Sequence, residues 1–103
     1  MKDRVLPLTQ GYVAVISGED WRRVNKYSWH VHKSRGSRKK IGKPYARANI
    51  KGKKVYLHRF ITGAEYPLHV DHKNHCTLDN RRENLEIVDH ITNMKRRRKK
   101  NVR

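Results

Sequence analysis

Cysteine is nearly absent from this chain, since Cys76 is the single one among 103 residues. One cysteine excludes an internal disulfide framework. It also excludes zinc sites built from paired thiolates, which need cysteines in twos or fours at close spacing. A metal bound by this chain is therefore expected to have oxygen and nitrogen ligands, and we expect no structural zinc.

Long apolar runs are also missing. No stretch approaches the roughly 20 apolar residues that span a bilayer, and the amino terminus has no signal-like apolar segment. The sequence therefore predicts a soluble, cytoplasmic protein. A length of 103 residues predicts one domain at most, with a modest core.

Acidic residues are scarce: 9 Asp and Glu stand against 26 Lys and Arg, which gives a formal net charge of +17. A field of this size attracts polyanions over long distances. Nucleic acid is therefore the first candidate partner.

The amino half, residues 5 to 57, consists of short apolar or alternating runs separated by turn-forming residues, which predicts a small antiparallel sheet. Residues 45–50 alternate polar and apolar side chains and so predict one polar and one apolar face. Residues 18–27 can form one short helix with Asp20 as its N-cap. Residues 33–43 contain little that is apolar, so we expect a mobile hairpin loop there that orders on DNA.

The carboxyl half predicts a different arrangement. Residues 57–62 favour a short turn or helix ended by Gly63, and two strands, around residues 68–70 and 85–88, flank a polar loop of about a dozen residues. A helix is expected to follow Asp89, and a basic run follows it. The predicted fold class is α+β, with a β-rich region at 1–57, a hairpin-helix unit at 58–94 and a basic tail at 95–103, all in one compact domain.

The polar loop and its flanks carry a motif: Leu57-His58-Arg59, then Val70-Asp71-His72, then Leu78-Asp79-Asn80-Arg81-Arg82-Glu83-Asn84-Leu85, and finally Asn93. These segments resemble the HNH endonucleases of phage and intron-homing type, and residues 8–11 and 27–29 resemble the segment that precedes the motif. The resemblance implies a ββα-metal fold, in which a helix crosses a two-stranded hairpin and one divalent ion lies between them. This sequence departs from the family pattern at His75 and Cys76, where many members have Gly and Asn.

The resemblance also implies roles for single residues. His72 would be the general base that deprotonates water, Asp71 and Asn93 would bind the metal, and Asn84 would orient the loop and the base. Mg²⁺ is the expected ion, with Mn²⁺ or other divalent ions as alternatives, and double-stranded DNA is the expected substrate. A neutral imidazole is required before attack, so we expect a nearby cation, the metal or Arg81, to lower its pKa and activity to rise with pH.

Several other residues have alternative interpretations. His58 either makes a structural hydrogen bond to the loop or contacts DNA or the metal site, whereas Asp79 and Asn80 are expected to shape a turn, and Trp21 and Trp29 to lie in the core. A noncatalytic basic DNA- or RNA-binding module on the same scaffold is the alternative function. The residues expected to contact nucleic acid are His58, Arg59, Arg81, Arg82, Lys95, Arg96, Arg97, Arg98, Lys99, Lys100 and Arg47.

Overall fold

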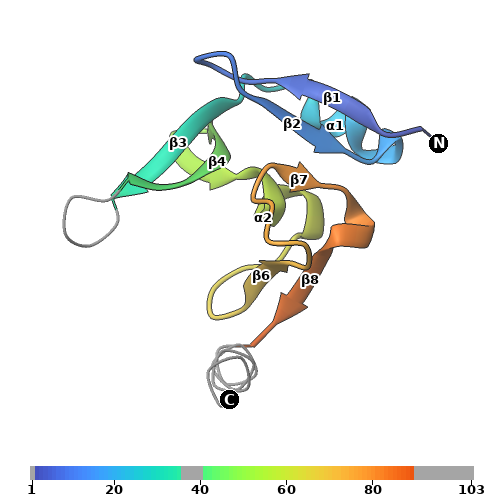
Figure 1. Cartoon of the computed structure of the whole chain (residues 1–103), viewed down its shortest axis with the longest axis vertical. Coiled ribbons are helices and arrows are strands. Elements are labelled where there is room, and N and C mark those ends of the chain that lie inside the picture. Colours follow the sequence, from blue (N-terminus) through green and yellow to red (C-terminus); the bar gives the residue numbers. More distant parts are fainter. Residues whose placement is uncertain (1, 36–40, 90–103) are drawn as a thin grey trace.

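The computed structural model describes residues 2–35 and 41–89. It is a small α+β structure with mostly antiparallel sheets and few helices, so the predicted fold class is confirmed at this level (Figure 1). The helix expected after Asp89, with Asn93, and the run 95–100 lie outside the described residues. The elements are β1 (Arg4–Pro7), β2 (Val13–Ile16), η1 (Gly18–Asp20), α1 (Trp21–Val24), β3 (His30–Arg35), β4 (Ile41–Ile50), β5 (Lys53–Tyr56), α2 (Leu57–Thr62), β6 (His69–His72), β7 (Asp79–Asn80), η3 (Arg82–Asn84) and β8 (Leu85–Val88).

The strands form three sheets, in the orders β1-β2-β7, β3-β4-β5 and β6-β8. The single sheet predicted for the amino half is therefore wrong. The first sheet takes its third strand from the carboxyl half, because β7 pairs in parallel with β2 through Val15 opposite Asp79 and Ile16 opposite Asn80. Asp79 and Asn80 were expected to shape a turn and instead form this strand. A two-residue strand has no periodicity, so the sequence pattern could not reveal its partner.

The second sheet shows the predicted alternation of faces. Ala46 and Ala48 of β4 are buried. Tyr45 and Arg47, which alternate with them along the strand, lie on the other face and remain partly exposed. The strands continue farther than predicted, since β3 runs to Arg35 and β4 begins at Ile41. Most of the predicted loop at 33–43 is therefore strand, and residues 36–40 lie outside the described part.

The single helix predicted for residues 18–27 is instead a 3₁₀ turn followed by the four-residue α1. Asp20 lies at the N-cap position of α1, but its side chain caps no backbone N–H. The side chain is completely buried and binds arginines instead. The arginines compete with the cap for the same carboxylate, and in an arginine–carboxylate pair both the donor and the acceptor are charged, whereas a backbone N–H is a neutral donor.

Helix α2 lies at the centre of the molecule and packs on strands from all three sheets (Figure 1). It ends as predicted at Gly63, whose φ of 74° is the left-handed conformation that glycine adopts without a Cβ penalty. Trp29 is 4% exposed, as predicted for a core residue, and its Nε1 donates to the Val24 carbonyl at 2.8 Å. The core draws on both halves of the chain: Leu6, Ala14, Ile16, Val24, Trp29, Ala46, Ala48, Leu57, Ile61 and Leu85.

Trp21 is partly buried and packs against this core, and the Arg4 guanidinium lies 4.2 Å from its ring centroid. In the described ranges, no helix has the length and apolar character to cross a bilayer.

Candidate active site

The two predicted strands of the motif form an antiparallel hairpin, with Asp71 opposite Glu86 and His72 opposite Leu85. Adjacent residues of a regular strand point to opposite faces, so Asp71 and His72 can serve one site only where the strand ends. Strand β6 ends at His72, and the residues from Lys73 to Asn84 form the connection to β8. His72 is 6% exposed.

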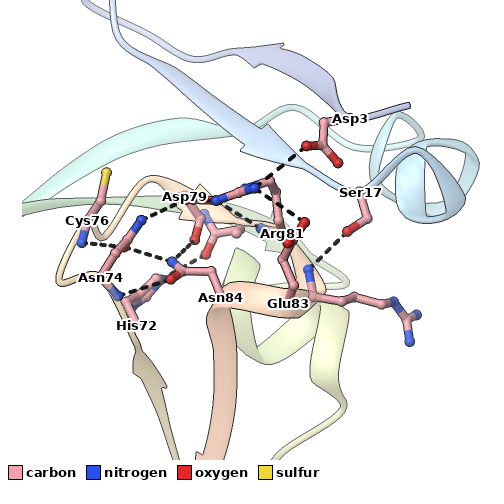
Figure 2. Close-up of polar contacts among 11 residues, drawn as sticks. Asp3, Ser17, His72, Asn74, Cys76, Asp79, Arg81, Glu83 and Asn84 are labelled. Atoms are coloured by element: carbon pink, nitrogen blue, oxygen red, sulfur yellow. Dashed lines mark hydrogen bonds and ion pairs between the residues drawn. The ribbon is translucent and has the colours of Figure 1, made fainter. Parts of the chain in front are cut away.

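Asn84 holds this connection together (Figure 2). Its Nδ2 donates to the Asn74 Oδ1 at 2.9 Å and to the Asp79 carbonyl at 2.8 Å, while its Oδ1 accepts from the Asn74 backbone N–H at 3.0 Å. The Asn84 carbonyl accepts from the Lys73 N–H at 2.9 Å. Asn84 therefore orients the loop, and the hydrogen bond to the His72 ring comes from a different residue.

That residue is Asn80, whose Oδ1 lies 3.0 Å from the His72 Nε2. Asn80 is 1% exposed, and the pairing of β7 with β2 fixes its backbone. Sequence reasoning missed this contact, because an Asn after an Asp in a polar loop is typical of a turn. The signal that could have found it was its place inside the motif.

Two aromatic side chains from other elements contact the His72 ring, and a third, Tyr56, packs against both of them. His58 of α2 lies 5.3 Å from the His72 ring, edge to face, and Tyr45 of β4 lies 6.2 Å away between ring centroids. Tyr56 stacks on His58 at 5.5 Å and meets Tyr45 at 5.9 Å. Among the described residues, the His58 side chain makes no hydrogen bond to the loop, and its ring packs against the His72 ring. A contact of His58 with DNA or the metal stays a prediction.

Burial lowers the pKa of both imidazoles. For His72, the Asn80 hydrogen bond and the Asp71 and Asp79 carboxylates act in the opposite direction without reversing the shift, and Lys43 adds to it. Burial, with His72 and Arg59 nearby, lowers the pKa of His58 to about 3. Both rings are therefore neutral near pH 7. The cation that contributes at His72 is Lys43, whereas the sequence had suggested Arg81.

Arg81 is occupied elsewhere. Its Nε and Nη2 donate to the two Asp79 carboxylate oxygens at 2.7 Å each, and its Nη1 lies 3.2 Å from Glu83 Oε1 (Figure 2). The hydrogen bonds from Arg81 hold the pKa of Asp79 below its usual range, and Asn74 contributes a further one. Asn74 thus ties Asp79 to the Asn84 network described above.

Two more of the predicted DNA-binding arginines also make internal contacts. Arg82 binds the buried Asp20 carboxylate, with Nη2 to Oδ1 at 2.7 Å, and Arg59 Nη1 donates to the Ala64 carbonyl at 3.4 Å. DNA binding by these arginines stays a prediction, and it would compete with these internal partners.

Arg47 lies on a different surface. The register of β3, β4 and β5 places a group of mostly polar side chains on the solvent-facing side of that sheet, which we call the polar face; it includes His30, His32, Tyr45, Arg47, Asn49, Lys54 and Tyr56. Burial together with the charges of Arg47 and Lys54 lowers the pKa of His32, which indicates that these groups lie near one another. Since Tyr45 and Tyr56 also contact His58, the polar face continues into the surroundings of His72.

Asp71 is the expected metal ligand. Burial, Tyr56 and the Asp71 carboxylate together raise the pKa of the Tyr45 phenol, which indicates that Asp71 lies near Tyr45. Within residues 2–35 and 41–89, no three His, Cys, Asp or Glu side chains gather as a metal-binding group. The second expected ligand, Asn93, is outside the described residues. The donor chemistry of one carboxylate fits Mg²⁺, which is usually held by one or two carboxylates and completed by water and phosphate oxygens.

Comparison of the chain with known protein families, with curated proteins and with solved structures finds no match.

Proposed function

We propose that this chain is a metal-dependent DNA endonuclease of the HNH kind, which hydrolyses phosphodiester bonds to 5′-phosphate and 3′-hydroxyl ends. One observation carries the proposal: Asp71 and His72 lie at the end of β6, in an antiparallel hairpin whose long connection is braced by Asn84. The order strand, polar connection, strand agrees with the first part of a ββα-metal unit.

His72 is suited to be the general base. Its ring is neutral near pH 7, as its lowered pKa indicates, and a neutral imidazole can take a proton from the attacking water. Asp71 and Asn93 would hold a divalent ion such as Mg²⁺. When bound, this ion supplies Lewis-acid stabilisation of the charge that develops on the phosphate and on the leaving oxygen.

The polar face is the surface on which we place the DNA. Arg47 and Lys54 provide positive charge there, and the face leads through Tyr45 and Tyr56 to His58 and His72. Contacts of this type to phosphate position a duplex without reading its sequence. A single site cuts one strand per engagement, so we expect nicks; dimerisation would convert them to double-strand breaks.

The alternative is a noncatalytic basic module that binds DNA or RNA with the same surfaces. Its charge and sheets would be identical. The paired Asp71 and His72, with His72 kept neutral, favour the nuclease, because binding a phosphate backbone requires neither group.

The test is incubation of the purified protein with supercoiled plasmid, with Mg²⁺, with Mn²⁺ or with a chelator. We expect metal-dependent nicking that falls by about 10² to 10⁴ in His72→Ala, the range of general-base catalysis. His75→Ala is the matched control, since His75 lies exposed in the same connection, and it should cut at the wild-type rate.

A wild type that binds DNA but cuts nothing with either metal would favour the binding module. Cutting that survives His72→Ala would show that another group is the base. Parallel binding measurements on structured RNA and duplex DNA at several salt concentrations identify the preferred polymer.

A further inference from the structure

Asn80 is placed unusually for a carboxamide. It is among the most completely buried large side chains of the described residues, and its Oδ1 is 3.0 Å from His72 Nε2. Its Nδ2 is buried and has no hydrogen-bond partner within residues 2–35 and 41–89. The side-chain hydrogen bond that Asn80 makes there is thus the one to His72.

This arrangement contributes little to stability. A buried amide N–H group without a partner costs about 1 to 3 kcal/mol, which is as large as or larger than the net gain from one neutral hydrogen bond. An apolar side chain of similar volume would avoid the cost of the unpaired N–H group. Buried groups that are left unsatisfied in this way require an explanation other than packing.

The contact also decides which nitrogen of His72 can act as a base. A carbonyl oxygen only accepts hydrogen bonds, so the nitrogen facing it must carry the proton. The other ring nitrogen, Nδ1, has no hydrogen-bond partner among the described residues. Nδ1 therefore keeps a free lone pair and is the ring nitrogen that can accept a proton.

We propose that Asn80 is a positioning residue for the nuclease reaction: its carbonyl holds His72 in the Nε2–H tautomer and in the orientation that presents Nδ1 to the attacking water. The role of Nδ1 as the base atom rests on the proposed function, whereas the tautomer does not.

The tautomer is measured directly by two-dimensional NMR on protein with ¹⁵N-labelled histidines, in which protonated and unprotonated ring nitrogens resonate far apart. Comparison with His72→Gln assigns the signals. We expect Nε2 of wild-type His72 to be protonated and Nδ1 to be bare at about pH 8.5, well above the usual histidine pKa. A bare Nε2 would mean that the amide is turned round and donates, and it would overturn the inference.

Two substitutions separate positioning from packing. Asn80→Leu keeps the approximate volume but removes the acceptor, so we expect the Nδ1–H form of His72 to gain population. We also expect kcat for nicking to fall at least about tenfold with the Kd for DNA unchanged. Asn80→Asp keeps an acceptor at the same place and should retain the wild-type tautomer and more of the wild-type kcat. Asn25→Leu, at an exposed position after α1, is the control.

Equal kcat in wild type and Asn80→Leu, or equal losses in Asn80→Leu and Asn80→Asp, would overturn the positioning role. If Asn80→Leu does not fold, the wild-type and Asn80→Asp spectra and rates decide the question. A protein that cuts no DNA with any metal contradicts the proposed function and, with it, the role of Nδ1 as the base atom, whereas the His72 spectrum still decides whether Asn80 fixes the tautomer.

Discussion

The ion pair between Arg82 and Asp20 allows the sharpest test of the fold. The two residues are 62 positions apart and join the connection between β6 and β8 to the amino half. Arg82 Nε lies 3.1 and 3.0 Å from the two Asp20 oxygens, and its Nη2 lies 2.7 Å from Oδ1. Arg23 Nη2 supplies a further contact at 3.0 Å. We therefore choose Arg82→Gln as the perturbation.

The magnitude follows from what the substitution leaves behind. Removing one partner of a fully buried ion pair costs about 3 to 5 kcal/mol, because the other charge stays buried. The Asp20 side chain is 0% exposed, but that of Arg82 is 50% exposed, and Arg23 remains in place. Solvent screening and the second partner reduce the effect, so we expect Arg82→Gln to lower the free energy of unfolding by about 2 kcal/mol.

The assay is urea denaturation followed by tryptophan fluorescence, where a lower midpoint at an unchanged slope reports reduced stability. Arg22→Gln is the matched control, because Arg22 is exposed on α1, and such surface changes usually stay within about 0.5 kcal/mol.

The pH dependence gives a second readout. Burial alone would raise the pKa of Asp20, but the hydrogen bonds from Arg82 and Arg23 outweigh it and hold the pKa below its ordinary value of 3.8. The contribution of the pair is therefore complete above that value, and it is lost as the pH falls through the folded-state pKa. The difference in the free energy of unfolding between wild type and Arg82→Gln should therefore become smaller in acid. If Arg82→Gln matches Arg22→Gln in stability, or if this difference does not become smaller, the reasoning is refuted.

Two further predictions concern the surroundings of His72. Because the pKa of His58 is lowered to about 3, the unfolded chain binds this proton more readily between that value and about 6.5. The free energy of unfolding should therefore decrease as the pH is lowered through this window, by up to about 1.4 kcal/mol per pH unit. His58→Phe should flatten the decline in urea titrations at several pH values, and an unchanged slope would contradict the burial of a neutral ring. Arg47→Gln with Lys54→Gln should weaken DNA binding and make the logarithmic salt dependence shallower by about one for each phosphate that the protein no longer neutralises. Filter binding at several salt concentrations measures this, with Arg22→Gln as reference; an unaltered salt slope would place the DNA elsewhere.

The local pattern of the sequence predicted the elements well where a short stretch of chain decides them. The helix ending at Gly63, the strands on either side of the polar connection, and the alternation of Tyr45 and Arg47 with buried alanines are all present. Each depends on neighbouring residues alone: on glycine's tolerance of positive φ, or on the period-two geometry of a strand. Even so, Asp20 shows the limit of local rules, since its capping position is correct and its hydrogen bonds are not.

The chemistry of the candidate site was readable from the sequence as residue types, with Asp71, His72 and Asn84 in one motif. Which side chain touches which was decided by the tertiary structure. Asn80 reaches the His72 ring because β7 pairs with β2, and His58 and Tyr45 reach it from α2 and β4. Arg81 was expected beside the imidazole and instead binds Asp79.

The sequence by itself thus determined the positive charge, the α+β class and the residue types of the candidate site. Those properties follow from composition and from the geometry of short segments, and they require no contact between residues far apart in the chain. Only the tertiary structure decided the partner of the imidazole, the burial that keeps it neutral and the face that continues from it. These features depend on contacts between residues far apart in the chain. The hydrogen bond to His72 and the burial of its ring form only when the sheets have assembled around α2.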